Sequence, residues 1–298
     1  MVEGECTVKP IKLDRKTKTA ALSVASNGFL IVIKLIVGIY SGSVSILSEA
    51  LHSTMDLIAS IIAVFSVRMS SKPADKNHPY GHGKIENISG LAEGLLIFAA
   101  AFMIIWESLK KLSTHHELNI TAAAVGVMFV SALINLWVSS ILYKVAKEED
   151  SIALEADALH LKTDVYTSAG VGIGLVLIKI TGLTIIDPIA AILVALLILK
   201  EAWNLCRKAF NPLLDSSLPE KEKRIIEQIL KEHTHRDLQF EKLRTRKSGP
   251  YRFVDFHVIT DPDISVKEAD EMTKHVVKEI ENHIPNVHVH INLEPKKE

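Results

Sequence analysis

Cysteine is almost absent from this chain of 298 residues, which contains only Cys6 and Cys206. Two cysteines this far apart make no disulfide framework, and no Cys-x-x-Cys spacing is present for a thiolate zinc site. Any bound metal must therefore be held by histidine, aspartate and glutamate. Excess charge is also missing, since the formal net charge is −1, and the composition gives no indication of nucleic acid as a partner.

Two motifs of enzymes and pumps are missing as well. The sequence has no His-Glu-x-x-His, which argues against a membrane metalloprotease, and no glycine-rich nucleotide-binding loop, which argues against ATP-driven transport. We therefore expect a protein that is not an enzyme.

Apolar residues are abundant and unevenly placed. They make up 48% of the chain, the mean hydropathy is +0.23, and the long apolar blocks stop near Asn211. This pattern predicts a cytoplasmic segment 1–17, a membrane domain 18–211 and a cytoplasmic domain 212–298. Six stretches are long enough to cross a bilayer: 18–40, 43–70, 86–112, 118–146, 153–181 and 184–209.

Positive charge orients these six spans. The segment before the first span is basic, and the link between the first two, Ser41-Gly42-Ser43, has no positive charge. The link between the second and third spans carries Arg68, Lys72, Lys76 and Lys84. By the positive-inside rule, both termini then lie in the cytoplasm, which for a bacterial chain means a protein of the inner membrane.

The last 87 residues or so read as a helix, two strands, a helix and a strand. The strands are expected near 239–247, 251–260 and 286–293, and the second helix near 265–283. Ser248-Gly249-Pro250 is a hairpin signal between the first two strands. The fold class predicted is an α-helical membrane protein with a ferredoxin-like αββαβ domain.

Two His-x3-Asp pairs lie inside apolar runs, His52 with Asp56 and His160 with Asp164. On a helix, residues four apart share a face, so two such helices could present four ligands to one divalent ion. Two carboxylates would neutralise the ion, and protons would replace it when it leaves, which predicts metal–proton exchange. The alternative is that these groups only bond neighbouring helices, as we expect for Glu93 and Asn27. Asp157 is expected to be a charge at the start of a helix near the membrane surface, and the alternative is a supporting or entry group one turn before His160.

The residues around these pairs resemble the cation diffusion facilitators, and within them the bacterial ferrous-iron and zinc efflux proteins. The resemblance covers essentially the whole chain, and its most specific segments are 48–56, 73–84, 156–164 and 243–250. It implies a homodimeric metal/proton antiporter that exports divalent ions and whose transport site is His52, Asp56, His160 and Asp164. Imidazole favours zinc, with ferrous iron, cadmium, cobalt and manganese as alternatives, and a non-transporting membrane sensor or scaffold as the rival class.

The resemblance implies further sites outside the membrane. It assigns Asp75, His78 and His82 to a second metal site in the loop after the second span. It pairs Lys84 with Asp215 in a salt bridge that holds the dimer together below the membrane. In the tail it makes His257, His290 and Asp270 regulatory zinc ligands, although Glu241 and Asn292 depart from the pattern and leave a binuclear site open. His275 and His288 are alternative ligands, and His233 is expected to be a surface residue.

Overall fold

The computed structural model describes residues 13–41, 44–113, 122–181, 183, 185–234 and 238–296. It divides into two compact units, Met1–Phe210 and Asn211–Glu298, which we call the membrane unit and the tail. Cys6 and most of the predicted segment 1–17 lie outside the described residues.

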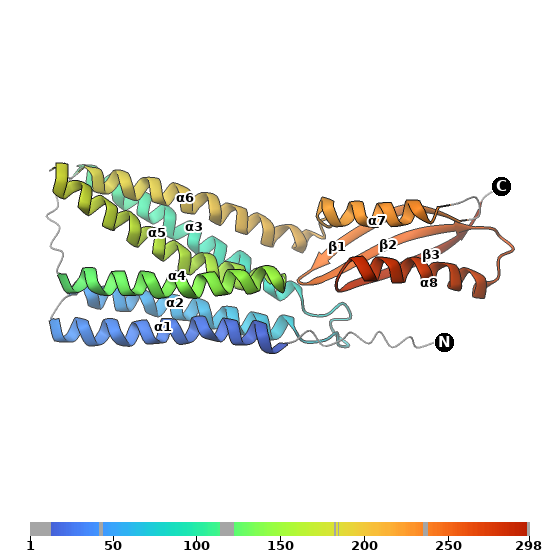
Figure 1. Cartoon of the computed structure of the whole chain (residues 1–298), viewed down its shortest axis with the longest axis horizontal. Coiled ribbons are helices and arrows are strands. Elements are labelled where there is room, and N and C mark those ends of the chain that lie inside the picture. Colours follow the sequence, from blue (N-terminus) through green and yellow to red (C-terminus); the bar gives the residue numbers. More distant parts are fainter. Residues whose placement is uncertain are drawn as a thin grey trace. The chain divides into compact units, whose positions relative to one another are not determined.

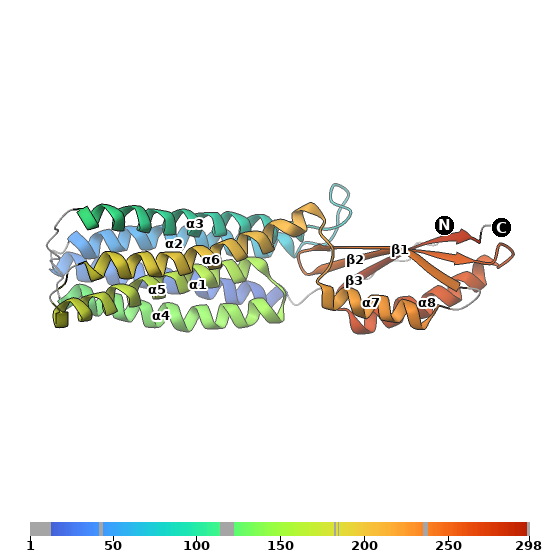
Figure 2. The same cartoon turned by 90° about the horizontal axis from the view of Figure 1, so that it is seen from above.

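Six long helices make up the described part of the membrane unit and lie side by side (Figures 1 and 2). Helix α1 packs against α2, α3 against α6, and α4 against α5. The helices are α1 (Leu13–Ser41), α2 (Val44–Ser70), α3 (Lys84–Ser113), α4 (Ala122–Glu148), α5 (Ile152–Thr181) and α6 (Ile186–Phe210).

Small residues lie where the helices meet, and large apolar residues face outward. Ala63, Ala101 and Ala158 are at most 2% exposed, whereas Phe65 and Leu133 are more than half exposed. Such a distribution suits helices that pack on one another through small side chains and face hydrocarbon elsewhere. Among the described residues, five helices are long and apolar enough to cross a membrane, and these are α1, α2, α3, α4 and α6. The remaining helix, α5, carries the second His–Asp pair.

The described residues of the tail form a short 3₁₀ helix, two α-helices and a three-stranded sheet of order β1-β2-β3. Strands β1 and β2 are antiparallel and β2 and β3 parallel, as a helical crossover between them requires. Gly249 adopts a φ of 57° in the tight turn between β1 and β2. The elements are η1 (Asn211–Leu214), α7 (Glu220–Glu232), β1 (Leu238–Ser248), β2 (Tyr251–Thr260), α8 (Val266–His283) and β3 (Val287–Pro295).

One face of the sheet is apolar and covered by α7 and α8, as Figure 2 shows. Along β2, Val254, Phe256 and Val258 are at most 1% exposed and belong to this core. Because side chains alternate along a strand, Asp255 and His257 lie on the opposite, open face. The predicted fold class, a helical membrane protein with an αββαβ tail, is confirmed.

Candidate metal centre

Three of the four predicted intramembrane ligands come together between α2 and α5. Nε2 of His160 lies 3.0 Å from Oδ1 of Asp56, and one ligand atom each of Asp56, His160 and Asp164 lies within 4.8 Å of the other two. The Asp56 side chain is 7% exposed and that of His160 21%. Two carboxylates and an imidazole this close, and this shielded, form a donor set that suits a divalent cation.

His52 does not belong to this cluster within the described structure. It lies one turn before Asp56 on α2, but its side chain is exposed and it is not among the ligand groups that meet within 4.8 Å. The spacing of four residues places His52 and Asp56 on neighbouring turns of one side of the helix, and Asp56 contacts His160 on α5. The role of His52 as a fourth ligand therefore stays a prediction.

A side chain that the sequence did not single out contacts the cluster from α4. Nδ2 of Asn135 donates to Oδ2 of Asp164 at 3.4 Å. Asn135 is 6% exposed, and a buried amide bonded to a carboxylate fixes the orientation of that carboxylate. In the sequence, Asn135 is a single amide within an apolar stretch, and the periodicity of that stretch does not show that the amide reaches a site.

A second polar network lies next to the cluster and joins α1, α2 and α5. Oγ of Ser23 and Oγ of Ser60 each lie 3.1 Å from Oδ1 of Asp157, and Nδ2 of Asn27 donates to Oγ of Ser60 at 2.7 Å. Ser60 also lies 3.1 Å from the backbone oxygen of Asp56. The prediction that Asn27 bonds a neighbouring helix fits these contacts. Asp157, expected as a helix-start charge near the membrane surface, is instead 0% exposed and bonded to serines of α1 and α2.

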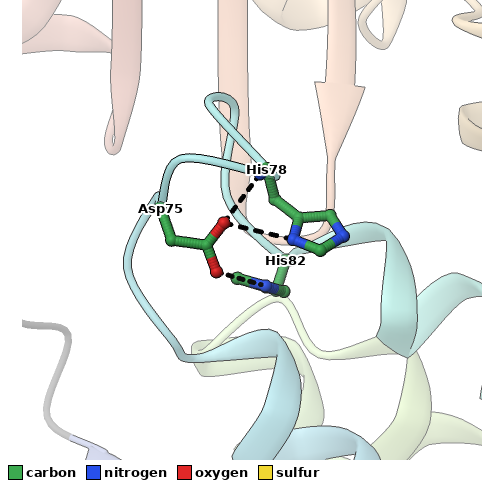
Figure 3. A group of neighbouring side chains, drawn as sticks. All are labelled: Asp75, His78 and His82. Carbon is green, nitrogen blue, oxygen red and sulfur yellow. Dashed lines mark hydrogen bonds and ion pairs between the residues drawn. The ribbon is translucent and has the colours of Figure 1, made fainter.

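The loop residues Asp75, His78 and His82 converge, and we call them the loop cluster (Figure 3). Oδ1 of Asp75 lies 3.2 Å from Nδ1 of His78, and Oδ2 lies 3.4 Å from Nε2 of His82. The two rings are 4.4 Å apart between centroids. Two imidazoles and a carboxylate within this short loop form a donor set that fits zinc.

Two backbone hydrogen bonds hold the carboxylate of Asp75 in the loop cluster. Oδ1 of Asp75 accepts the backbone N–H of His78 at 2.7 Å and that of Asn77 at 2.9 Å. The bond from His78, followed by that from Asn77, lowers the pKa of Asp75 below its ordinary value. Nδ1 of His82 is buried and has no hydrogen-bond partner among the described residues. The lowered pKa of Asp75 keeps its carboxylate ionised, as a metal ligand must be.

The predicted tail ligands do not form one group within the chain. His257 lies on the open face of the sheet, where its Nδ1 is 2.7 Å from Oε1 of Glu294. His290 lies on the same face, 3.8 Å from Asp255, whereas Asp270 lies on α8 and pairs with Lys274. Asn292 is directly opposite His257 in the parallel register. The regulatory zinc site at His257, His290 and Asp270 stays a prediction.

The two members of the predicted salt bridge belong to different units. Lys84 is the first residue of α3. Asp215 directly follows η1 and lies 3.6 Å from Nη1 of Arg246 on β1. Their proposed pairing in a dimer is likewise untested.

These features define a class: a helical membrane protein with clustered imidazole and carboxylate groups inside its spans and a small αββαβ tail. The family model described as the cation efflux transmembrane domain matches residues 20–214, and the one described as the cytoplasmic domain of cation efflux proteins matches residues 218–296. The chain therefore belongs to the cation efflux family, and the resemblance to the cation diffusion facilitators is confirmed.

Individual relatives agree with the family match. A transporter of Synechocystis sp. is 33% identical over 93% of this chain and 89% of its own length. The cation-efflux pump FieF of Shewanella oneidensis is 34% identical over 84% of each chain. A solved structure of CzrB in its Zn form is 30% identical and covers 28% of this chain and 93% of its own, with a TM-score of 0.26. The protein is a membrane transporter of divalent metal cations.

Proposed function

We propose that this chain exports zinc from the cytoplasm in exchange for protons, and that the exchange takes place between α2 and α5. The observation that carries the proposal is the 3.0 Å contact of His160 Nε2 with Asp56 Oδ1, with Asp164 beside it. These groups lie within the apolar stretches of two helices. Intramembrane ionisable residues arranged in this way typically mark an ion pathway.

The contact between His160 and Asp56 supports coupling to protons. A ring nitrogen and a carboxylate oxygen at this distance share a proton, because two lone pairs facing each other would repel. Zinc needs both lone pairs as ligands, so its binding releases that proton. A second proton on the remaining carboxylate would balance the charge of one divalent ion. Binding of metal and of protons is therefore mutually exclusive at this site.

The donor set supports zinc over harder cations. Imidazole nitrogen suits zinc, whereas magnesium and manganese prefer sites made entirely of oxygen. His160 contributes one such nitrogen, and we propose that His52 contributes a second when α2 turns relative to α5. Four ligands would then surround the ion with tetrahedral geometry. The exposed position of His52 in the present conformation would serve as the point where a hydrated ion is first met.

The proposal also covers the oligomeric state, the orientation in the membrane and the metal sites outside it. We propose that the chain forms a homodimer in the inner membrane, with both termini in the cytoplasm and with the Lys84–Asp215 pair across the dimer. The loop cluster and the His257–His290 region would bind cytoplasmic zinc and adjust transport to its level. The positive charge of the link between α2 and α3 supports the placement of both termini in the cytoplasm.

The test is zinc flux into proteoliposomes with an imposed proton gradient. The parent chain is compared with Asp56→Ala and with Glu107→Gln, which changes an exposed residue of α3 outside the ligand group. We expect gradient-driven flux in the parent and in Glu107→Gln, and none in Asp56→Ala. Flux of ferrous iron, cadmium or manganese at the same gradient ranks the metals.

Two results would contradict the proposal. If the parent binds zinc but moves none under any gradient, the chain acts as a sensor or scaffold. If Asp56→Ala carries zinc as fast as the parent, the transport site lies elsewhere.

A further inference from the structure

A third group of metal-ligating side chains lies in the tail, on the side of the sheet opposite to His257 and His290. His233 directly follows α7 and caps its C-terminal end, and His275 and Glu279 lie on α8, which packs beside α7 (Figure 2). Nε2 of His233 is 3.2 Å from Oε2 of Glu279. The rings of His233 and His275 are 5.4 Å apart between centroids. One ligand atom from each of the three residues lies within 4.8 Å of the other two.

The backbone at the end of α7 determines which nitrogen of His233 faces this group. Nδ1 of His233 lies 2.9 Å from the carbonyl oxygen of Ile229. A carbonyl oxygen can only accept, so Nδ1 carries the hydrogen. In the neutral ring, Nε2 is then the nitrogen with the lone pair, and it is the atom that lies 3.2 Å from Oε2 of Glu279. A hydrogen bond to one ring nitrogen that orients the other for coordination is the usual arrangement of histidines at metal sites.

The spacing on α8 supplies the other two ligands. His275 and Glu279 are four residues apart, so their side chains rise from neighbouring turns on one side of the helix. The side chains of His233 and Glu279 are 25% and 27% exposed, and His275 is exposed. The group is thus reachable from solvent while its members are held by two helices that already pack together. Either a proton or a metal cation can lie between Nε2 of His233 and the carboxylate of Glu279.

We propose that His233, His275 and Glu279 form a binding site for a zinc-like divalent cation that joins the end of α7 to the middle of α8. Two imidazoles and one carboxylate provide three ligands, and water completes the tetrahedron. We call this group the helix clamp. Its donors select zinc or cobalt over magnesium or calcium, which prefer oxygen ligands.

The helix clamp is separate from the sites described above. His257 and His290 lie on the open face of the sheet, whereas α7 and α8 cover the opposite face. The strands and their core of Val254 and Phe256 lie between the two. An ion in the clamp adds a cross-link between two helices that already pack together, and so restrains the end of α7. This site does not depend on transport or on its direction.

The experiment counts bound cobalt on the full chain in detergent, by equilibrium dialysis against Co²⁺ followed by elemental analysis. The parent is compared with His233→Ala, His275→Ala and the control His283→Ala. His283 is a matched control, because its Nδ1 also bonds a carbonyl oxygen one turn back, that of Glu279, at 2.8 Å. We expect His233→Ala and His275→Ala each to lose one Co²⁺ per chain, and His283→Ala to bind as many as the parent.

A second measurement guards against misfolding of the His233 variant. Hydrogen exchange of the backbone amides at the end of α7 should slow when Co²⁺ is added to the parent. His275→Ala, a change of an exposed side chain on the other helix, should abolish this protection. The proposal is overturned if parent, His233→Ala and His275→Ala bind equal numbers of ions, or if His283→Ala loses the same ion. Neither measurement involves flux. If the transport proposal failed, the cobalt counts and the hydrogen exchange would therefore stay as expected here, so the two failures can be told apart.

Discussion

His160 on α5 and Asp56 on α2 are 104 positions apart in the chain, and their side chains meet at 3.0 Å. Each residue is paired in the sequence with another potential ligand four positions away, yet the shortest contact crosses between helices. A contact of this kind changes when the two helices move relative to each other. The site can therefore respond to helix movement, which a site on one helix could not do.

The amide of Asn135 should govern how well the site binds metal. Because its Nδ2 donates to Oδ2 of Asp164, Asn135→Ala frees that carboxylate to turn away. We expect zinc affinity or transport to fall roughly 10- to 100-fold, as for the loss of other groups that orient a ligand. Zinc flux measured over a range of concentrations checks this.

Ser140→Ala is the matched control for Asn135→Ala. Its hydroxyl lies on the same helix and is exposed, and it bonds only the backbone oxygen of Leu136 among the described residues. Equal effects of the two substitutions would show that Asn135 matters to helix packing rather than to the site.

The loop cluster should lose its metal when its aspartate is removed. Asp75 contacts both His78 and His82 and also accepts two backbone N–H groups. Asp75→Ala should therefore release one zinc per chain and loosen the loop, while Lys76→Ala should do neither. Elemental analysis after dialysis measures the first effect, and proteolysis of the loop the second. An unchanged zinc count in Asp75→Ala would show that the loop cluster does not bind zinc.

A buried ion pair should contribute strongly to the stability of the membrane unit. Nζ of Lys16 lies 3.4 Å from Oε1 of Glu86, and their side chains are 2% and 0% exposed. Ser70 and Ser151 also donate to this carboxylate, at 2.8 and 2.5 Å. Glu86→Ala leaves the lysine buried without its partner, which costs roughly 3–5 kcal/mol in comparable cases.

Thermal unfolding of the full chain in detergent measures the effect of Glu86→Ala. Glu107→Ala is the control, since Glu107 is exposed on the same helix and its loss should change the free energy of unfolding by less than about 0.5 kcal/mol. If both variants unfold at the temperature of the parent, the pair contributes no net stability.

The start of α8 should weaken in acid. Ser265 caps the helix and donates through its hydroxyl and its backbone N–H to Oε2 of Glu268, at 2.7 and 3.1 Å. The hydroxyl bond and then the backbone bond lower the pKa of Glu268. A carboxyl with a lowered pKa stabilises the folded state fully above its ordinary value of 4.5, and this stabilisation is lost as the pH falls through the lowered value.

Glu268→Gln tests the sign of this effect, because it keeps an oxygen acceptor and removes the titration. Hydrogen exchange at the first turn of α8, followed from neutral to acidic pH, should accelerate in the parent and stay flatter in Glu268→Gln. A steeper acid response in the glutamine variant would contradict the assignment.

Much of the fold was predictable because each signal is local. The apolar runs gave the spans, and the alternation of Val287, Val289 and Ile291 predicted the last strand, observed as Val287–Pro295. The hairpin at Ser248-Gly249-Pro250 follows from turn chemistry. The bulge in β1, where the register shifts between Glu241 and Arg244, has no local signal, since Lys242 adopts its positive φ of 53° under the constraints of the sheet.

The sequence by itself determined which residues could serve as ligands, which of them share a helix face, and where the chain enters an apolar phase. These depend on helical spacing and side-chain chemistry alone. Only the tertiary structure decided that Asp56 meets His160 while His52 is exposed and outside the group that meets within 4.8 Å, and that His233, expected at the surface, lies against Glu279. Which face of one helix meets which face of another depends on packing between segments far apart in the chain, and spacing within one segment does not specify it.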